Sequence, residues 1–504
     1  MRRANKKLYF AARVGVMRRA ARLVTKAVVW LAVISIAVIA TIIVGFAVQA
    51  RLNLPELRPW HKVGLTEEFR AARADAPRTF DEYRSLEDRL FAELRTRVLD
   101  DPAMADSYTI GRFNPKSVPA RLALETPYNR SFELVPERIR GGVLLVHGLT
   151  DSPYMMRGLA ELFYQHGFYV LALRLPGHGT APAGLVDVHW QDWYAAVTLA
   201  AKHVASRAGP GKPFYASGFS TGAPLVTLYA LRSLEDTSLP RPQRLVLLSP
   251  AIGISEFAVF TNVVAGLAFI PYFEKSRWLD VWPEYDPYKY NSFPVNAANQ
   301  IYLLTRELRR SIDVAESKEK LDAMPRVLAF QSLVDATITA GEVAHGLLAR
   351  LPPAGHELVV FDLNRGAALE DLIAAGPRED LERIRTAPAL PFRFTLVANR
   401  SAGADEVVAY TREAGSNQWD VTELGLRWPQ GVLSLSHVAL PLPPDDPVYG
   451  LDPRSAEGPA YMLGNLTLRG ESGSWVVPLG QFVRLRSNPF FAVVRERIVA
   501  AIEG

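Results

Sequence analysis

The sequence predicts an α/β fold with a central, mostly parallel sheet, preceded by one membrane-spanning helix. From about residue 140, short apolar runs alternate with stretches of helical periodicity, and a Gly-x-Ser-x-Gly turn joins one such run to the helix after it. Continuous apolar strands separated by helices are typical of parallel sheets covered on both faces. A long uncharged run near the N-terminus predicts the membrane helix.

The composition excludes several classes of protein. The 504 residues are 49% hydrophobic and 22% charged, which excludes a disordered chain and a polytopic membrane protein. The absence of Cys excludes disulfides, thiolate zinc sites and a Cys nucleophile. Nine of the 57 Lys and Arg residues lie in residues 1–26, which contain no Asp or Glu. The rest of the chain therefore has 48 basic and 52 acidic residues. This mildly acidic remainder argues against a nucleic-acid partner.

Residues 27–48 predict a transmembrane helix. They hold no charged side chain, and 22 helical residues at ~1.5 Å each span ~33 Å, enough for a hydrocarbon core of ~30 Å. The apolar region of a signal peptide is shorter, ~7–15 residues, so we expect an uncleaved anchor. The preceding basic run predicts that residues 1–26 form a cytoplasmic tail. The rest of the chain is then expected on the outer (periplasmic or extracytoplasmic) side of the cell inner (plasma) membrane.

The elements after the anchor follow from capping and periodicity. Residues 49–112 form a juxtamembrane segment, in which Thr79 and Glu82 make a capping pair that begins an amphipathic helix ending near residue 100. Strands are predicted at residues 142–146, 168–173, 213–216, 245–248, 326–330 and 358–361, and a strand-like run occurs at residues 392–397. Helices are predicted at residues 155–164, 193–207 and 223–234.

The Gly-Phe-Ser-Thr-Gly sequence at residues 218–222 predicts a nucleophile, Ser220. A strand-like run precedes it and a helical stretch follows it, which is the context that a nucleophile elbow requires. The two glycines allow a tight turn that exposes Ser220 at the start of the helix. Because a Ser hydroxyl is a weak nucleophile, it needs a neighbouring base.

The base is expected after the nucleophile and after an acid, the order that accompanies such an elbow. Three histidines follow Ser220: His345, His356 and His437. His345 lies inside a helical pattern, and His356 opens a predicted strand. His437 lies in a loop beyond the last core strand, so we favour His437, with His356 as the alternative.

The acid and the oxyanion donors are expected at strand ends. Asp335 follows the strand at residues 326–330, and Asp362 is the alternative because it also follows a strand. An acid at that edge can orient the base and stabilise its imidazolium form. The oxyanion hole is expected from the backbone N–H groups of Leu149 and Thr221. His147 is interpreted as structural.

Five stretches together resemble a known family. They read LLVHGLTDSPYMMRGLAELF, LRLPGHGTAP, ASGFSTG, QSLVDATI and SHVALP, and they span about residues 140–440. In order and spacing they resemble the α/β-hydrolases of the monoacylglycerol lipase, lysophospholipase and carboxylesterase group, also classed with S33 serine aminopeptidases. The 102 residues between Asp335 and His437 exceed the family's usual spacing, and an insertion at about residues 363–430 accounts for the excess. The region around residues 461–484 has no recognised counterpart.

The resemblance implies an α/β-hydrolase fold over residues 113–504, with a helical cap at about 251–297. It implies ester hydrolysis through an acyl-enzyme by Ser220, Asp335 and His437, with no metal or organic cofactor. Two alternatives remain: a non-catalytic scaffold that binds a protein partner, and a peptidase or thioesterase of the same fold. The sequence does not indicate an oligomeric state.

The cap segment indicates the class of substrate. Residues 255–293 hold 11 aromatics in 39 positions. Such side chains can line an acyl pocket, which favours an acyl or lipid-like ester as substrate. The candidate pocket residues are Phe257, Phe260, Phe269, Phe273, Trp278 and Trp282.

Overall fold

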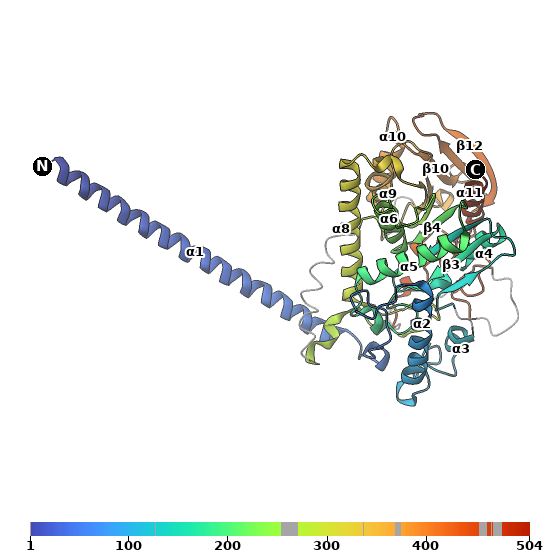
Figure 1. Cartoon of the computed structure of the whole chain (residues 1–504), viewed down its shortest axis with the longest axis horizontal. Coiled ribbons are helices and arrows are strands. Elements are labelled where there is room, and N and C mark those ends of the chain that lie inside the picture. The colour runs from blue at the N-terminus through green and yellow to red at the C-terminus, as the bar shows by residue number, and fades with distance from the viewer. Residues whose placement is uncertain are drawn as a thin grey trace.

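A ten-stranded sheet forms the centre of the protein (Figure 1). The structure is a computed structural model that describes residues 2–125, 128–253, 271–335, 337–367, 374–452, 461–464, 466 and 476–504. The strands of the sheet lie in the order β1-β3-β2-β4-β5-β8-β9-β10-β11-β12. Their bounds are β1 Phe132–Leu134, β2 Gly141–Val146, β3 Phe168–Leu173, β4 Phe214–Phe219, β5 Arg244–Leu248, β8 Arg326–Ser332, β9 Glu357–Phe361, β10 Arg393–Asn399, β11 Glu406–Arg412 and β12 Asp420–Arg427.

The interior of the sheet is parallel and its edges are antiparallel. Every pairing from β3 to β10 is parallel, whereas β1, β11 and β12 pair in antiparallel fashion. The strands from β2 to β9 are buried along nearly their whole length, as their continuous apolar sequences predict. The carboxyl ends of the parallel strands therefore meet at one edge, where ligands of open α/β sheets bind.

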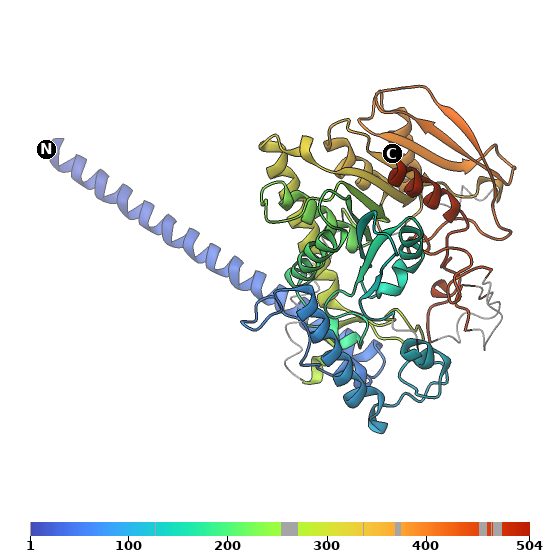
Figure 2. The ribbon, with the colours of Figure 1, turned by 45° about the vertical axis from the view of Figure 1, so that its right-hand side comes forward.

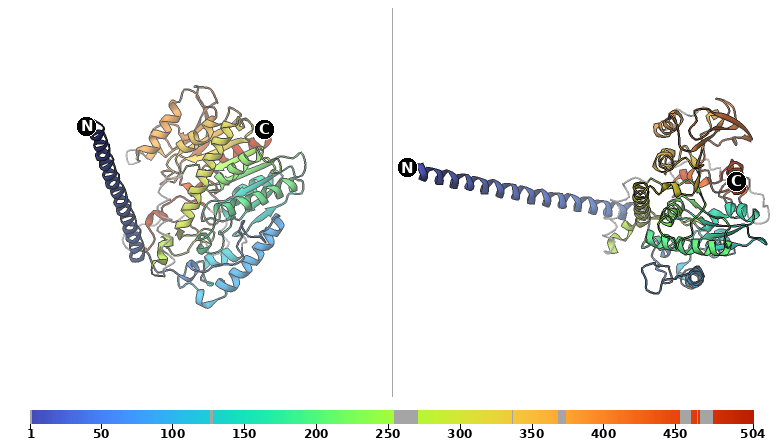
Figure 3. Two further views of the ribbon diagram at one scale, coloured as in Figure 1. Left: turned by 60° about the vertical axis from the view of Figure 1, so that its left-hand side comes forward. Right: turned by 45° about the horizontal axis from the view of Figure 1, so that its top comes forward.

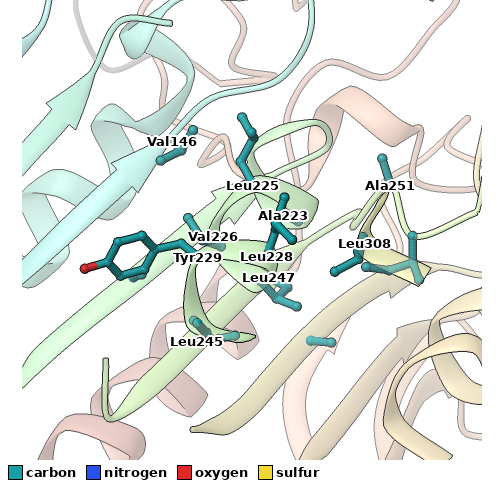
Figure 4. Close-up of a cluster of buried hydrophobic side chains, with 14 of the residues drawn as sticks. Val146, Ala223, Leu225, Val226, Leu228, Tyr229, Leu245, Leu247, Ala251 and Leu308 are labelled. Carbon is teal, nitrogen blue, oxygen red and sulfur yellow. The ribbon is translucent and has the colours of Figure 1, made fainter. Parts of the chain in front are cut away.

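Helices cover both faces of the sheet (Figure 2). Helices α4 (Arg157–Gln165) and α11 (Phe491–Glu503) pack on one face, together with Val143 and Leu145 of β2. The next residues along β2, Leu144 and Val146, face the other side. That side is covered by α5 Trp190–Ala208, α6 Gly222–Ser233, α8 Val295–Ser317, α9 Ala340–Gly346 and α10 Ala375–Thr386. Figure 4 shows how α6 buries Leu225, Leu228 and Tyr229 near Leu245 and Leu247 of β5.

Residues 363–430, the predicted insertion, are part of the central sheet. This stretch adds strands β10, β11 and β12 to the end of the sheet, next to β9. The predicted strand-like run at 392–397 is β10, and it pairs with β9 in parallel register. The stretch still separates Asp335 from His437, but it does so as part of the same sheet.

Helix α1 (Arg2–Asn53) projects away from the rest of the protein (Figures 1 and 3). Residues 22–42 are long and apolar enough to cross a membrane, and none of this window is buried. The window overlaps the predicted span at residues 27–48. The C-terminal end of α1 contacts the short helix η7 (Pro271–Arg277) of the cap. The cap continues through a two-stranded sheet of β6 Trp278–Asp280 and β7 Phe293–Pro294.

The juxtamembrane segment packs on the main domain through α2 (Phe80–Leu94). The Thr79 side chain accepts from the Glu82 N–H at 3.2 Å, which caps the helix as its sequence predicts. Helix α2 buries Phe80 and Tyr83 in the core cluster of the main domain. One π-helical turn, Arg95–Leu99, follows it, and α3 (Val118–Glu125) leads towards β1.

Candidate active site

Ser220 lies in a sharp turn between β4 and α6. Its φ of 51° places it in the left-handed region, which a non-glycine residue rarely adopts. Its N–H donates to the Leu248 carbonyl at 3.0 Å, and its own carbonyl accepts from Ala223 at 3.1 Å and Ala251 at 3.2 Å. These backbone bonds hold the turn against its strain and leave the Ser220 side chain at the edge of the sheet.

The two glycines of the turn are required by close backbone approach. A Cβ on Gly222 would lie 2.1 Å from the Val146 carbonyl oxygen. A Cβ on Gly218 would lie 2.4 Å from the backbone nitrogen of Ala223. No side chain fits at either position without moving α6 away from β2 and β4, so the sequence Gly-x-Ser-x-Gly follows from the packing.

The structure brings Ser220, His437 and Asp335 together. The Nε2 atom of His437 lies 2.9 Å from Ser220 Oγ, and its Nδ1 atom lies 2.6 Å from Asp335 Oδ2. An ionised carboxylate can only accept, so Nδ1 bears the proton and Nε2 is free to accept from the Ser220 hydroxyl. This is the arrangement that a nucleophile and its base require.

The charge of Asp335 is fixed by its neighbours. Burial alone would raise the pKa of Asp335, but the facing His437 and the backbone N–H groups of Thr337 and Ile338 hold it below its ordinary value. These N–H groups donate to Oδ1 at 2.8 and 3.1 Å, and Gln331 donates to Oδ2 at 3.1 Å. Asp335 therefore stays ionised, and its Oδ2 atom accepts the hydrogen bond from His437 Nδ1.

Two serines position the loop that contains His437. Ser249, which follows β5, donates to the backbone carbonyl of His437 at 3.1 Å. Ser332, at the end of β8, donates to the carbonyl of Leu435 at 2.7 Å. Residues at the edge of the sheet thus hold the loop backbone at His437 and at Leu435, two residues earlier. Sequence reasoning missed both serines, because nothing in their local sequence distinguishes them from ordinary loop serines.

The alternative base and acid lie elsewhere. His356 precedes β9, at the opposite end of the sheet, where its Nδ1 accepts from the Val327 N–H at 3.0 Å. Burial lowers the pKa of His356 to about 4, which suits a neutral structural histidine. Asp362 pairs with Arg365 at 2.7 Å rather than with a histidine. His345 lies in α9.

A cavity of about 370 Å³ opens over Ser220 and His437. Leu149 and Thr221, the expected oxyanion donors, both line it. Its apolar lining includes Met155, Trp282, Phe293, Ile301, Val438 and Leu442. Its charged lining consists of Asp280, Lys289, Arg484 and Arg486, none of which the sequence motifs indicated. No group of three or more potential metal ligands occurs within the described ranges.

The aromatic residues expected in the pocket have different positions. Trp282 lines the cavity. Trp278 does not: it is buried beside Val186 and Val281, and its ring lies 4.9 Å from that of His61. The expectation for Trp278 is corrected because the juxtamembrane segment supplies it with apolar and aromatic partners outside the cavity. Phe257, Phe260 and Phe269 lie outside the described residues, as does the side chain of Phe273.

His147 is held in one tautomer beneath the site. Its Nε2 accepts from the Leu175 N–H at 3.1 Å, so Nδ1 bears the proton and donates to the Gly148 carbonyl at 2.8 Å. Burial lowers the pKa of His147 to about 3. Because a trans peptide places its C=O and N–H on opposite sides, this bond turns the Leu149 N–H away from His147.

Comparisons with known proteins find relatives of part of the chain. Residues 137–347 match the family model described as serine aminopeptidase, S33. A thermostable monoacylglycerol lipase of Bacillus sp. (strain H-257) is 39% identical over 88 residues, which are 18% of this chain and 34% of that lipase. The chain has an α/β-hydrolase fold, and residues 137–347 match this family model. It resembles the lipase- and esterase-like group within that fold, as its motifs predicted.

Two solved structures illustrate the likeness. One comes from a study of metagenome-derived lipolytic enzymes, with 23% identity, 52% of this chain and 99% of that chain covered, and a TM-score of 0.37. The other is a monoacylglycerol lipase of Paleococcus ferrophilus, with 18% identity, 46% and 88% covered, and a TM-score of 0.35. The family match ends at residue 347, so His437 and the C-terminal segment of this α/β-hydrolase lie beyond it.

Gly222→Ala is expected to disrupt the turn. The added methyl group would meet the Val146 carbonyl, so α6 must shift and Ser220 must move with it. We expect a loss of stability of roughly 1–3 kcal/mol, typical of overpacking. Thermal unfolding of the detergent-solubilised full chain measures it. Gly376→Ala is the matched control, because no atom lies within 4 Å of its added methyl group. Equal unfolding temperatures for the two variants would contradict the packing argument.

Proposed function

We propose that this α/β-hydrolase is a membrane-anchored serine hydrolase that cleaves carboxylic esters with lipid-like acyl chains. The observation that supports it most directly is the continuous hydrogen-bonded series from Asp335 through His437 to Ser220. It lies at the floor of a largely apolar cavity. This chain matches about a third of the length of the curated lipase. The proposed activity is therefore argued from the residues of this chain.

The proposed reaction proceeds through an acyl-enzyme. Ser220 Oγ attacks the ester carbonyl carbon while His437 Nε2 takes the hydroxyl proton. The carbonyl oxygen becomes an oxyanion, for which the N–H groups of Leu149 and Thr221 are the proposed donors. His437 then gives its proton to the leaving alcohol, and the acyl group stays on Ser220. Water repeats the same steps and releases the acid.

His147 supports the oxyanion role of Leu149. The hydrogen bond from His147 Nδ1 fixes the Gly148 carbonyl, and with it the direction of the Leu149 N–H. A donor fixed before the reaction needs no reorganisation when charge develops on the substrate oxygen. His147 is thus a positioning residue in this proposal and does not touch the substrate.

Helix α1 is the proposed anchor, with its basic N-terminus in the cytoplasm. Its end is joined to the cap: Lys275 donates to the Leu54 carbonyl at 2.8 Å and pairs with Glu56 at 2.9 Å. Leu54 and Leu57 pack against Trp278 and its apolar neighbours. The cap is therefore attached to the membrane-proximal end of α1 through residues next to its cavity-lining part, Asp280 and Trp282, which favours substrates drawn from the bilayer.

Reactivity towards a fluorophosphonate tests the catalytic proposal. Ser220→Ala should abolish labelling, and His437→Ala should reduce ester turnover by roughly 10⁴-fold or more if the three residues act as a unit. His356→Ala is the matched histidine control and should lose far less activity per folded molecule. Folded protein that does not label at Ser220 would instead favour a non-catalytic scaffold.

A chain-length series of nitrophenyl esters tests the acyl preference. Burying one methylene is worth about 0.8 kcal/mol, so four should raise kcat/KM roughly a hundredfold. Trp282→Ala should flatten this gradient because Trp282 lines the cavity, whereas Trp278→Ala should lower stability without flattening it. A profile that peaks at acetate would contradict the lipid-like substrate class.

Reporters fused after Gly504 test the orientation. A reporter that works only in the cytoplasm should be silent, and one that works only outside it should be active, because the positive-inside rule retains residues 1–26 in the cytoplasm. The opposite result would place the catalytic domain in the cytoplasm.

A further inference from the structure

Three cations line the catalytic cavity, and two of them have partners. Lys289 pairs with the buried Asp151 at 2.5 Å. Arg486 pairs with the buried Asp286 at 3.3 Å. Arg484 makes no hydrogen bond or ion pair with any part of the chain that the structure describes. Among the described residues, Arg484 is therefore the cavity cation whose guanidinium has no acidic partner.

The acids nearest to Arg484 are already engaged. Asp335 and Asp151 attract its charge, and the neighbouring Arg486 repels it. Asp335 accepts from His437, Gln331 and two backbone N–H groups, and Asp151 holds Lys289. Asp280 also lines the cavity, but it forms no ion pair with Arg484, and burial raises the pKa of its carboxyl group. Asp335 and Asp151 are therefore not available as partners of Arg484.

The segment that contains Arg484 is attached beside the catalytic histidine. Ser436, the residue before His437, donates to the carbonyl of Leu485, the residue after Arg484. The leaving oxygen of an ester must come within hydrogen-bond reach of His437 Nε2 to receive a proton. The Ser436 bond holds Arg484 beside the loop of His437, and both residues line the same cavity. An ester bound for proton transfer to its leaving oxygen therefore has its alcohol part in the cavity that Arg484 also lines.

A guanidinium taken partly out of water is unfavourable without an anion or other acceptors. Burial lowers the pKa of Arg484, which reflects this cost. The planar guanidinium has five N–H donors and binds carboxylate or phosphate with two parallel hydrogen bonds. A substrate anion would supply the partner that the described part of the chain does not.

We propose that Arg484 forms an anion subsite in the catalytic cavity and selects acyl esters whose alcohol part bears a phosphate or carboxylate. This inference rests on the proposed ester hydrolysis. It assigns a use to the C-terminal segment, which lies beyond the residues that match the family.

Three matched esters test the subsite: 1-lauroylglycerol, its 3-phosphate, and 3-lauroylglycerate, which bears a carboxylate in the same place. We expect the anionic esters to have kcat/KM values at least about tenfold above the neutral ester, the effect of one hydrogen bond to a charged group. Arg484→Met should reduce that ratio to about one, and Arg484→Lys should restore part of it. Arg495→Met is the matched control, an exposed arginine of α11 outside the cavity.

The two anionic esters distinguish phosphate from carboxylate recognition, and preference for either supports the subsite. Equal turnover of all three esters by the wild-type chain, or an equal loss on all three in Arg484→Met, would overturn it.

A binding measurement separates failure of the anion subsite from failure of the proposed function. Hexyl phosphate should bind Ser220→Ala roughly tenfold more tightly than hexanol does, and Arg484→Met should remove the difference. Lack of ester turnover with this binding intact would refute the hydrolysis alone, and absent binding would refute the subsite.

Discussion

The left-handed backbone of Ser220 is the constraint on which the site depends. A residue in that conformation costs of order 1–3 kcal/mol and persists only where its surroundings enforce it. Here the carbonyl of Leu248 and the closeness of Gly222 to β2 enforce it. Thr150 and Ser249 are also left-handed, at φ 65° and 42°, and both follow strands at the same edge. Strain is thus concentrated where three neighbouring strands end.

The same edge determines where the base must lie. His437 is 102 residues from Asp335, yet its loop is fixed by serines at the ends of β5 and β8. Loop-closure entropy grows only slowly with length, so a long excursion between acid and base is tolerated when both ends return to fixed positions. Strands β10 to β12 lengthen the connection without disturbing it, because they extend the far side of the sheet and leave β4, β5 and β8 adjacent.

Elements that local sequence patterns determine could be predicted from the sequence. Strand pairings and cavity residues that depend on contacts between distant parts of the chain could not. The buried strands and the turn around Ser220 follow from continuous apolar runs and two glycines. Strand β12 was missed because it is largely exposed and its sequence is polar. Strand β10 was predicted as a strand, but its place beside β9 depends on a pairing that no local pattern encodes. Arg484 belongs to no motif, and only the fold brings it to the cavity.

Chemistry and selectivity come from different parts of this chain. The family match contains Ser220, Asp335 and Lys289, and the chain beyond it contains His437, Arg484 and Arg486. A shared fold restricts the reaction more than the substrate, because selectivity depends on groups added around the site. An apolar cavity in which Arg484 has no acidic partner among the described residues suits an amphiphile that has one acyl chain and one anionic group. If α1 is the proposed anchor, its contact with the cap would hold that cavity near the bilayer, where such molecules partition.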